Sequence, residues 1–356
     1  MSAYILADPD TAEAPVLEDA PEDALGRPVR DLRISLLDRC NFRCPYCMPE
    51  SEFHQDYQFL RKPQLLTHDE ILTIASVAVK LGVTKLRLTG GEPLLDKKAP
   101  ALVQALAGLQ GVEDLALTTN GTLLAPMAGS LAKAGLHRVT VSLDTLDERI
   151  FREMSGNRGD LRKVLQGIEA AEKAGLSPVK INTVVQRGVN DHTVLDLLEH
   201  FRGSGHIVRL IEFMDVGNRN AWRMDQVVPS RELLDRIHER WTVRPIGRSY
   251  PGEVASRYEY EDGMGQIGFI SSVTEPFCGA CSRARLSADG VLYTCLFATA
   301  GTSLRDPLRE GADEKRLAEI MRAVWLRRKD RYSELRRPDA TNAHVLKKVE
   351  MYRMGG

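Results

Sequence analysis

Apolar residues follow two alternating patterns from Asp31 to about residue 215. Short runs of leucine and β-branched residues predict buried strands, and stretches with an apolar residue every three or four positions predict amphipathic helices. Regular alternation of the two is typical of a parallel sheet with crossover helices. The predicted strands are 32–37, 85–91, 114–121, 138–144, 179–185 and 206–214, and the predicted helices include 68–81, 98–109, 123–134, 160–174 and 191–202.

Six strand-helix units of this size fit either an open doubly wound sheet or most of a barrel. The strand ends favour the barrel, because the apolar runs finish in RLTGGEP, LTTNG, VSLD and EFMDVGN. Polar and glycine-rich strand ends are expected around the shared mouth of a barrel. We therefore predict an α/β fold built on an incomplete (β/α)6 TIM-like barrel. A full barrel has eight strands, so another part of the chain must close the gap.

The regular alternation stops after about residue 225. Residues 241–297 predict short antiparallel strands, with turns at Asp262-Gly263 and at Asp289-Gly290. Residues 312–329 return to a helical pattern with one apolar face. The C-terminal third of the chain is therefore expected to be a smaller α+β region.

The first 26 residues differ from the rest of the chain in charge. They hold seven acids and no lysine or arginine, with prolines among small residues. This composition predicts a disordered acidic leader. The predicted organisation is thus a leader at 1–26, a partial barrel at 27–225, and a C-terminal region at 226–356 whose antiparallel strands close the barrel mouth.

Overall charge and hydropathy exclude several classes of partner. The 48 lysines and arginines nearly balance the 49 acids, so there is no overall electrostatic case for nucleic acid or an acidic membrane surface. No apolar stretch approaches the roughly 18 to 20 residues of a membrane span, and the N-terminus lacks the pattern of a signal peptide. We expect a cytoplasmic protein that binds neither nucleic acid nor membrane.

The six cysteines fall into two groups of three. In a reducing compartment such groups are more often metal or cluster ligands than disulfides. Cys40, Cys44 and Cys47 directly follow the first predicted strand, which places them at the barrel mouth. Three thiolates on a 4Fe-4S cluster leave one iron open for another ligand. The alternatives are a zinc loop with His54 as fourth ligand, or a cluster of reactive thiols.

The second group is Cys278, Cys281 and Cys295, again without an obvious fourth ligand. A zinc ribbon normally has four thiolates, with a second CxxC pair. A second cluster with its own open iron is the favoured interpretation, and zinc is the alternative.

Basic residues lie on several of the predicted strands. Arg33 and Arg87 are on the first two, Lys180 is on the fifth, and Arg283 and Arg285 lie between the cysteines of the second group. A buried guanidinium stays charged and is costly unless it is paired or bound to an anion. Convergent cations therefore predict a multiply charged anionic ligand such as a phosphate. The alternative is structural ion pairing with acids such as Glu92 or Asp144.

Two motifs resemble a known superfamily. CxxxCxxC in the loop after the first strand, followed one unit later by GGEP at 90–93, resembles the radical S-adenosylmethionine (SAM) superfamily. DLRISLLDRCNFRCPYCMP, KLRLTGGEPLL, TTNG, VSLDTLD, VKINTVV, IEFMDVGN, CxxCSRARLSADG and the final Gly-Gly together resemble the GTP 3′,8-cyclase family of molybdenum cofactor biosynthesis. This resemblance covers residues 30–356 and implies a partial barrel of the radical SAM type.

The resemblance also implies the composition of the site. It implies two 4Fe-4S clusters, one on Cys40, Cys44 and Cys47 and one on Cys278, Cys281 and Cys295. SAM would be bound by Tyr46, Gly91, Ser142 and Met214, and GTP by Arg33, Arg87, Thr118, Lys180, Arg283, Ala284 and Arg285. Catalytic roles in cyclisation would fall to Arg283, Arg285 and a tail formed by Gly355 and Gly356.

The implied reaction begins with a 5′-deoxyadenosyl radical from SAM. It would abstract the ribose 3′ hydrogen of GTP, and attack on guanine carbon 8 would give 3′,8-cyclo-7,8-dihydro-GTP. The implied partners are a reductant protein such as flavodoxin or ferredoxin and, downstream, a cyclic pyranopterin monophosphate synthase. A monomer and a homodimer both fit the sequence. The competing interpretations are a radical SAM enzyme that modifies peptides and carries an auxiliary cluster, or a non-catalytic zinc-binding module.

Overall fold

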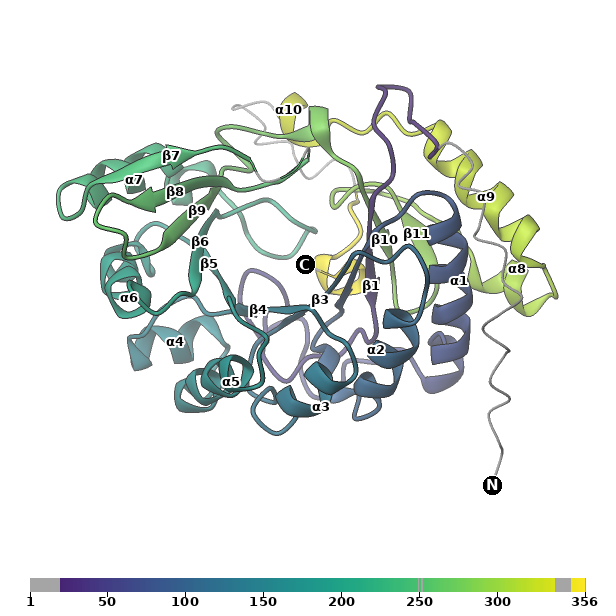
Figure 1. Cartoon of the computed structure of the whole chain (residues 1–356), viewed down its shortest axis with the longest axis horizontal. Coiled ribbons are helices and arrows are strands. Elements are labelled where there is room, and N and C mark those ends of the chain that lie inside the picture. The colour runs from purple at the N-terminus through teal and green to yellow at the C-terminus, as the bar shows by residue number, and fades with distance from the viewer. Residues whose placement is uncertain (1–19, 249, 251, 337–346, 356) are drawn as a thin grey trace.

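The structure, a computed structural model, describes residues 20–248, 250, 252–336 and 347–355. Its twelve named strands form one curved sheet in the order β12-β11-β10-β1-β2-β3-β4-β5-β6-β9-β8-β7. Figure 1 shows helices along the outside of this sheet and the C-terminal end of the chain within its curve.

The middle of the sheet consists of six parallel strands in sequence order. They are β1 (Asp31–Ser35), β2 (Lys85–Thr89), β3 (Asp114–Thr119), β4 (Arg138–Ser142), β5 (Lys180–Val185) and β6 (Ile207–Glu212). All six predicted strands are confirmed, and most end a few residues earlier than predicted because the chain turns where polar and glycine residues begin. The sheet is open, as an incomplete barrel requires.

Helices between these strands cover the outer face of the sheet (Figure 1). They are α1 (His68–Lys80), α2 (Ala99–Ala107), α3 (Ala128–Lys133), α4 (Glu148–Met154), α5 (Leu161–Lys173), α6 (Val194–Phe201) and α7 (Ser230–His238). The helical patterns predicted the position of each except α4 and α7. The signal for α4 is Asp147, whose carboxylate accepts a hydrogen bond from the Ile150 backbone and so caps the helix.

Strand residues alternate between the helices and the interior. On β1, Leu32 and Ile34 are fully buried in the apolar core, while Arg33 between them faces the other side. On β2, Leu86 and Leu88 are buried in the same core and Arg87 shares the interior side with Arg33. The period of two thus places basic residues inside the curve of the sheet.

The C-terminal strands extend both edges of the sheet. They are β7 (Val243–Ile246), β8 (Ser256–Tyr260) and β9 (Gln266–Ile270) at one edge, and β10 (Arg283–Leu286), β11 (Val291–Tyr293) and β12 (Thr302–Ser303) at the other. Antiparallel pairing is confirmed within each group, but β9 joins β6 and β10 joins β1 in parallel, which the sequence did not predict. The open edges of β1 and β6 explain this pairing, because it satisfies backbone groups that would otherwise be exposed.

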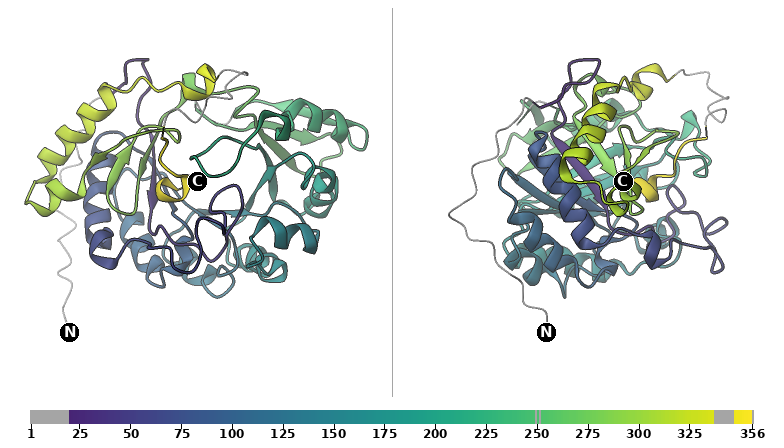
Figure 2. Two further views of the ribbon diagram at one scale, coloured as in Figure 1. Left: turned by 180° about the vertical axis from the view of Figure 1, so that it is seen from behind. Right: turned by 90° about the vertical axis from the view of Figure 1, so that its right-hand side faces the viewer.

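Short helices complete the described chain. They are α8 (Arg305–Arg309), α9 (Glu314–Leu326), α10 (Tyr332–Leu335) and α11 (Met351–Met354), with 3-10 helices at Lys62–Gln64, Pro93–Leu95, Asp191–Thr193, Met224–Gln226 and Cys278–Ala280. The predicted helix at 312–329 is α9, which packs against α1, and α11 contacts β1. The left view in Figure 2, seen from behind, shows the yellow helix α11 within the curve of the sheet. None of the described helices is long and apolar enough to cross a membrane.

The end of the predicted leader is folded. Residues 1–19 lie outside the described residues, but Glu22 pairs with Pro28 in a β-bridge and Asp23 is buried. Residues 20–26 thus belong to the folded part of the chain, although their composition predicts disorder. Asp23 is held there by ion pairs with Arg27 and with Arg328, a distant residue that composition does not reveal.

Candidate functional site

A cavity of about 330 Å³ lies inside the curve of the sheet, and both cysteine groups line it. Side chains from the carboxyl ends of the parallel strands and from the C-terminal region surround it. Of the residues predicted to bind SAM or GTP, the structure places nine on its wall: Tyr46, Gly91, Ser142, Met214, Arg33, Arg87, Thr118, Arg283 and Arg285. Lys180 and Ala284 are not on the wall, Gly355 is described but does not line it, and Gly356 lies outside the described residues.

The first cysteine group occupies the loop after β1. The Cys44 carbonyl accepts hydrogen bonds from the backbone of Cys47 (2.9 Å) and Met48 (2.8 Å), which closes the loop into a turn. The Phe42 backbone donates to the Cys40 sulfur at 3.4 Å. Burial raises the pKa of the Cys40 thiol to about 12 and also raises the pKa values of Cys44 and Cys47. Thiols must lose their protons to become ligands, and buried thiols with raised pKa values do so when they bind a cationic metal centre.

Arg43 stabilises this loop through hydrogen bonds to backbone carbonyls. The sequence analysis did not identify this residue. Its Nη1 donates to the carbonyls of Cys40 (2.7 Å) and Phe42 (2.8 Å), and its Nε donates to the Phe53 carbonyl (2.8 Å). His54, the predicted alternative ligand, has a side chain that is 58% exposed and does not line the cavity. Among the residues that the structure describes, no three His, Cys, Asp or Glu side chains could hold one metal ion together.

The second cysteine group belongs to the C-terminal region, around β10 and β11, but lines the same cavity as the first group. Arg283 Nη2 donates to the Cys281 sulfur at 3.2 Å, and the Phe297 backbone donates to the Cys295 sulfur at 3.4 Å. Burial alone would raise the pKa of Cys281, but the Arg283 and Arg328 guanidiniums outweigh it and lower the pKa to about 6. Each group therefore supplies three thiols, which fits a 4Fe-4S cluster with one iron left for a substrate.

The GGEP segment holds the first cysteine loop in place. A Cβ on Gly91 would lie 2.0 Å from the Arg39 carbonyl oxygen, so only glycine allows this close approach. Glu92 is buried and accepts hydrogen bonds from the Thr119 hydroxyl (2.7 Å) and the Asn120 backbone (2.8 Å). Burial raises the pKa of Glu92 to about 7.

The predicted alternative of ion pairs with Glu92 or Asp144 is not what the described residues show. Asp144 accepts a hydrogen bond from the Tyr46 hydroxyl and one from the Val184 backbone, both at 2.8 Å. Both carboxylates are hydrogen-bonded by neutral donors, and among the described residues neither forms an ion pair with an arginine or lysine.

The cations form one cluster along the cavity wall. Arg87 donates to the Thr118 and Thr140 hydroxyls at 3.1 and 3.2 Å, and Arg209 donates to Asn182 at 2.9 Å. Within the described chain, the buried Nε atoms of Arg33 and Arg87 have no hydrogen-bond partner. Unpartnered guanidinium donors on a cavity wall fit the oxygens of an anionic ligand.

Among the lining residues that the sequence reasoning missed are Lys85, Arg138, Arg209 and Tyr250. The signal for three of them was available, because Lys85, Arg138 and Arg209 fall on the interior face of KLRLT, RVTVS and IVRLIE by the period of two. Lys85 and Arg138 both pair with Asp114 at the start of β3. Tyr250 accepts a hydrogen bond from Lys85 at 3.0 Å.

Burial and mutual repulsion lower the pKa values of the basic residues in this cluster. Burial is the larger cause, and the charges of neighbouring cations lower the pKa values further. They lower the pKa of Arg209 to about 9, of Arg285 to about 10 and of Lys180 to about 7, and they lower the pKa of Arg33 and Arg87. A polyanion in the cavity would relieve this repulsion.

The pKa of Lys180 leads to a pH prediction. Burial and the charges of Arg138, Arg209, Arg87 and Lys85 lower it to about 7, so a bound triphosphate should raise it again. If Lys180 binds GTP, as the family resemblance implies, its contribution to affinity is complete below pH 7 and is lost as pH rises, by up to about tenfold per pH unit. Equilibrium dialysis with GTP between pH 6.5 and 9 measures this slope. In Lys180→Gln the slope should fall to that of GTP's own ionisation, and an unchanged slope would contradict the prediction.

The C-terminal tail lies beside the first cysteine group, because Tyr352 belongs to an apolar cluster against which Cys40 and Cys47 pack. It also reaches Arg285 on β10. Arg285 donates hydrogen bonds to the carbonyls of Gly355 and Met354. Gly355 has a φ of +72°, and a Cβ there would collide with the Thr89 hydroxyl. The tail is held by a hydrogen bond of 2.7 Å between the hydroxyls of Tyr352 and Tyr57.

Asp215, in the segment after β6, anchors the chain on both sides of residues 337–346. It accepts hydrogen bonds from Arg336 Nη2 (2.8 Å), Lys348 Nζ (2.8 Å) and the Tyr332 hydroxyl (2.5 Å). Burial alone would raise the pKa of Asp215, but Arg336 and Lys348 outweigh it and lower the pKa. This anchor was also missed, because its partners are more than 100 residues away in sequence.

Two families match successive parts of the chain. Residues 34–201 match the Radical SAM superfamily, and residues 206–334 match Molybdenum Cofactor Synthesis C. The solved structure of Streptococcus suis SuiB bound to S-adenosylmethionine superposes with a TM-score of 0.57 at 15% identity, over 83% of this chain and 68% of that chain. At this identity the likeness concerns the fold alone.

Curated relatives match almost the whole chain. The GTP 3′,8-cyclase of Xanthomonas campestris pv. campestris (strain B100) is 54% identical over 348 residues, which cover 98% of this chain and 99% of the relative. The GTP 3′,8-cyclase of Acidothermus cellulolyticus is 52% identical over 322 residues, or 89% of each chain. That of Staphylococcus aureus (strain MRSA252) is 44% identical over 336 residues, which are 94% and 98% of the two chains.

Proposed function

The chain belongs to the GTP 3′,8-cyclase family of the radical SAM superfamily, and from this premise we propose that it converts GTP to 3′,8-cyclo-7,8-dihydro-GTP. This lyase reaction is the first step of molybdenum cofactor biosynthesis. The observation that carries the proposal is one cavity lined by two groups of three thiols and, between them, by arginines from β1, β2, β6 and β10.

Two 4Fe-4S clusters are the cofactors, one for each cysteine group, and SAM is the co-substrate. The cluster on the first group, when bound together with SAM, supplies the 5′-deoxyadenosyl radical that abstracts the ribose 3′ hydrogen. Tyr46, Gly91, Ser142 and Met214 bind SAM in this proposal, and their shared position on the cavity wall supports it. Asp144 fixes the Tyr46 ring through the hydrogen bond to its hydroxyl.

GTP is held between the two cysteine groups. Arg33, Arg87 and Thr118 bind the phosphate and ribose oxygens, with Lys85, Arg138 and Arg209 beside them on the wall. Lys180 does not line the cavity but lies close enough to these cations to repel them, and in this proposal it joins them in binding the phosphates. Arg283, Ala284 and Arg285 place the guanine against the second cysteine group. Holding the ribose and the purine in one fixed arrangement favours ring closure through proximity.

Arg285 also binds the tail. Its hydrogen bond to the Gly355 carbonyl supports the proposal that the Gly355-Gly356 tail takes part in cyclisation. Gly90 and Gly355 meet at the end of β2, so the tail closes one end of the site. The surrounding sheet and tail keep bulk water from the reacting groups.

The proposal extends to organisation and partners. We retain a barrel part at 27–225 and a C-terminal part at 226–356, joined by one continuous sheet. An electron donor such as flavodoxin or ferredoxin reduces the first cluster, and a cyclic pyranopterin monophosphate synthase consumes the product. Six thiols used as cluster ligands suit a cytoplasmic location.

Isotope transfer tests the proposed reaction. The reduced protein is incubated with SAM and either ordinary GTP or GTP deuterated at the ribose 3′ position. We expect one deuterium in the 5′-deoxyadenosine released, because the radical takes that hydrogen. If the nucleoside carries no deuterium while the cyclised product forms, the assigned abstraction site is wrong.

A further inference from the structure

We infer that Asp23, Arg27 and Arg328 form a buried clamp that positions the backbone of the second cysteine group. This clamp, called the amino-terminal clamp below, joins the segment before β1 to the chain after α9. The inference rests on the proposed function only in assigning a cluster to Cys278, Cys281 and Cys295.

Asp23 is the centre of the clamp. Its carboxylate is fully buried, and the side chains of Arg27 and Arg328 are 3% and 1% exposed. Asp23 Oδ2 accepts hydrogen bonds from Arg27 Nε at 2.7 Å and Arg328 Nη1 at 3.0 Å. Its Oδ1 accepts from the backbone of Leu25 and of Arg27. Both oxygens of the carboxylate are therefore occupied.

The two guanidiniums that Asp23 holds also donate hydrogen bonds to backbone carbonyls of the second cysteine group. Arg27 Nη1 donates to the Cys278 carbonyl at 2.7 Å, and Arg328 Nη1 donates to the Cys281 carbonyl at 2.6 Å. Arg328 Nε donates to the carbonyl of Thr294, the residue before Cys295, at 3.1 Å. The clamp thus reaches the peptide group at or next to every cysteine of the group.

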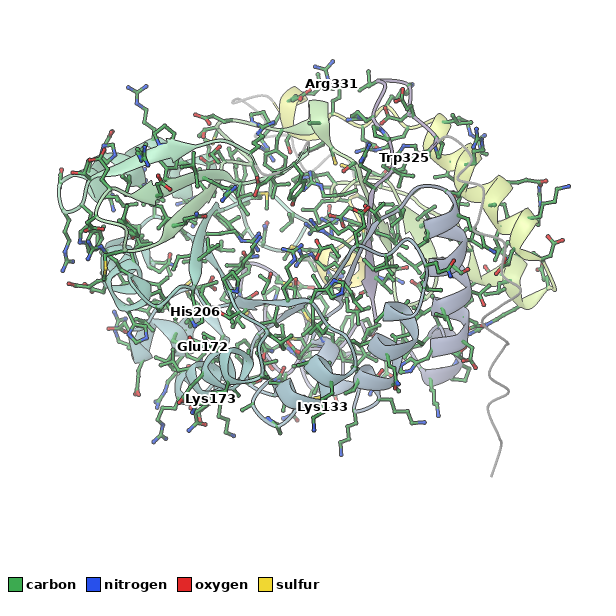
Figure 3. All side chains as sticks on the ribbon, in the orientation of Figure 1. Lys133, Glu172, Lys173, His206, Trp325 and Arg331 are labelled. Atoms are coloured by element: carbon green, nitrogen blue, oxygen red, sulfur yellow. The ribbon has the colours of Figure 1, made fainter. Side chains whose placement is uncertain are left out.

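Further contacts keep the clamp in place. The Trp325 indole donates to the Arg27 carbonyl at 2.9 Å, and the Arg328 guanidinium lies over the Trp325 ring, 4.6 Å from its centre. The Ala24 backbone donates to the Arg328 carbonyl at 3.2 Å. Figure 3 labels Trp325 at the end of α9, beside the segment that precedes β1. Surface lysines such as Lys133 point away from the molecule in the same view.

The cysteine loop needs such support because little regular structure holds it. Cys278 begins a 3-10 helix of three residues, Cys281 follows that helix directly, and Cys295 follows the end of β11. Charge-assisted hydrogen bonds to their carbonyls fix the peptide planes and so the directions of the thiols. Asp23 and Arg27 do not line the cavity, so they are positioning residues rather than catalytic ones.

Hydrogen exchange of the iron-free, full-length protein tests the clamp without reference to any cluster. Asp23→Asn removes the counter-charge that Arg27 and Arg328 share, and leaves Arg328 with Asp330 alone, 3.4 Å from its Nε. We expect amide exchange in residues 278–297 to become at least tenfold faster. Leu131→Ala, which opens a cavity on α3 away from both cysteine groups, is the control for a general loss of stability and should leave this segment unchanged.

Arg27→Lys provides a second variant if Asp23→Asn does not fold. Lysine keeps the charge beside Asp23 but has a single nitrogen, whereas Arg27 donates to Asp23 from Nε and to the Cys278 and Asp330 carbonyls from Nη1. It should raise exchange in the same segment by a smaller factor. Unchanged exchange there in the folded variants would overturn the inference.

Iron binding provides the second readout. In a background with Cys40, Cys44 and Cys47 replaced by alanine, only the second group can hold a cluster. Asp23→Asn should reduce the iron retained after anaerobic reconstitution at least twofold relative to that background, and Leu131→Ala should not. Full retention in Asp23→Asn would contradict the positioning role. If exchange rises as expected but the background itself binds no iron, the clamp stands and the proposed second cluster fails.

Discussion

Cys44→Ala should abolish the formation of 5′-deoxyadenosine and of cyclised GTP together. Cys44 is one of the three thiols at the carboxyl end of β1, and its carbonyl also closes the turn that carries Cys47. With two thiolates left, the first cluster should not persist, so about four of eight irons should be lost. The measurements are iron content and the yield of 5′-deoxyadenosine under strong reductant.

Cys278→Ala is the matched comparison, since it removes a thiol from the second group and leaves the first intact. It should lose GTP cyclisation and the iron of the second cluster, yet still form 5′-deoxyadenosine. Equal loss of SAM cleavage in the two variants would contradict the separate roles given to the two groups.

Arg285→Ala should lower the rate of GTP cyclisation by about 10² to 10³-fold, the usual effect of removing one preorganised donor from a site. Arg285 is buried on β10, beside Arg33 on β1, and it donates to the Gly355 carbonyl. Its loss removes a cation from the cavity wall and also removes the hydrogen bonds to the carbonyls of Met354 and Gly355 in the tail. Both clusters should remain, because no cysteine depends on it for a hydrogen bond among the described contacts.

Product formation, iron content and SAM cleavage without cyclisation are the measurements for Arg285→Ala. Arg244→Ala is the control, because Arg244 is an exposed arginine on the edge strand β7 and pairs with Glu259. It should keep full activity. Loss of iron in Arg285→Ala would instead give Arg285 a structural role.

Local patterns in the sequence were enough to predict the centre of the fold. The six parallel strands and most of their helices follow from runs of apolar residues such as those of β1 and β2. The meeting of the cysteine groups at one cavity also followed from local signals, because strand ends meet at one edge and the cysteine spacing is typical of ligands. The predicted SAM and GTP contacts rest on the family resemblance instead. Arg33 and Arg87 were found because they interrupt apolar strands.

Features that depend on distant pairings could not be predicted in this way. The parallel pairing of β10 with β1 joins residues about 250 apart. Asp23 belongs to an acidic stretch whose composition suggests disorder, and only its contacts with Arg27 and Arg328 make it part of the fold. Asp215 likewise gains its role from Arg336 and Lys348. Single-sequence reasoning has no access to such partners.

Two incomplete sets of cysteine ligands line one cavity, and we propose that each holds an iron-sulfur cluster. The decisive measurement is the count of iron and acid-labile sulfide per chain after anaerobic reconstitution of the unmodified protein. We expect about eight irons and eight sulfides in a brown protein. A colourless protein with two zinc ions and no sulfide would contradict it.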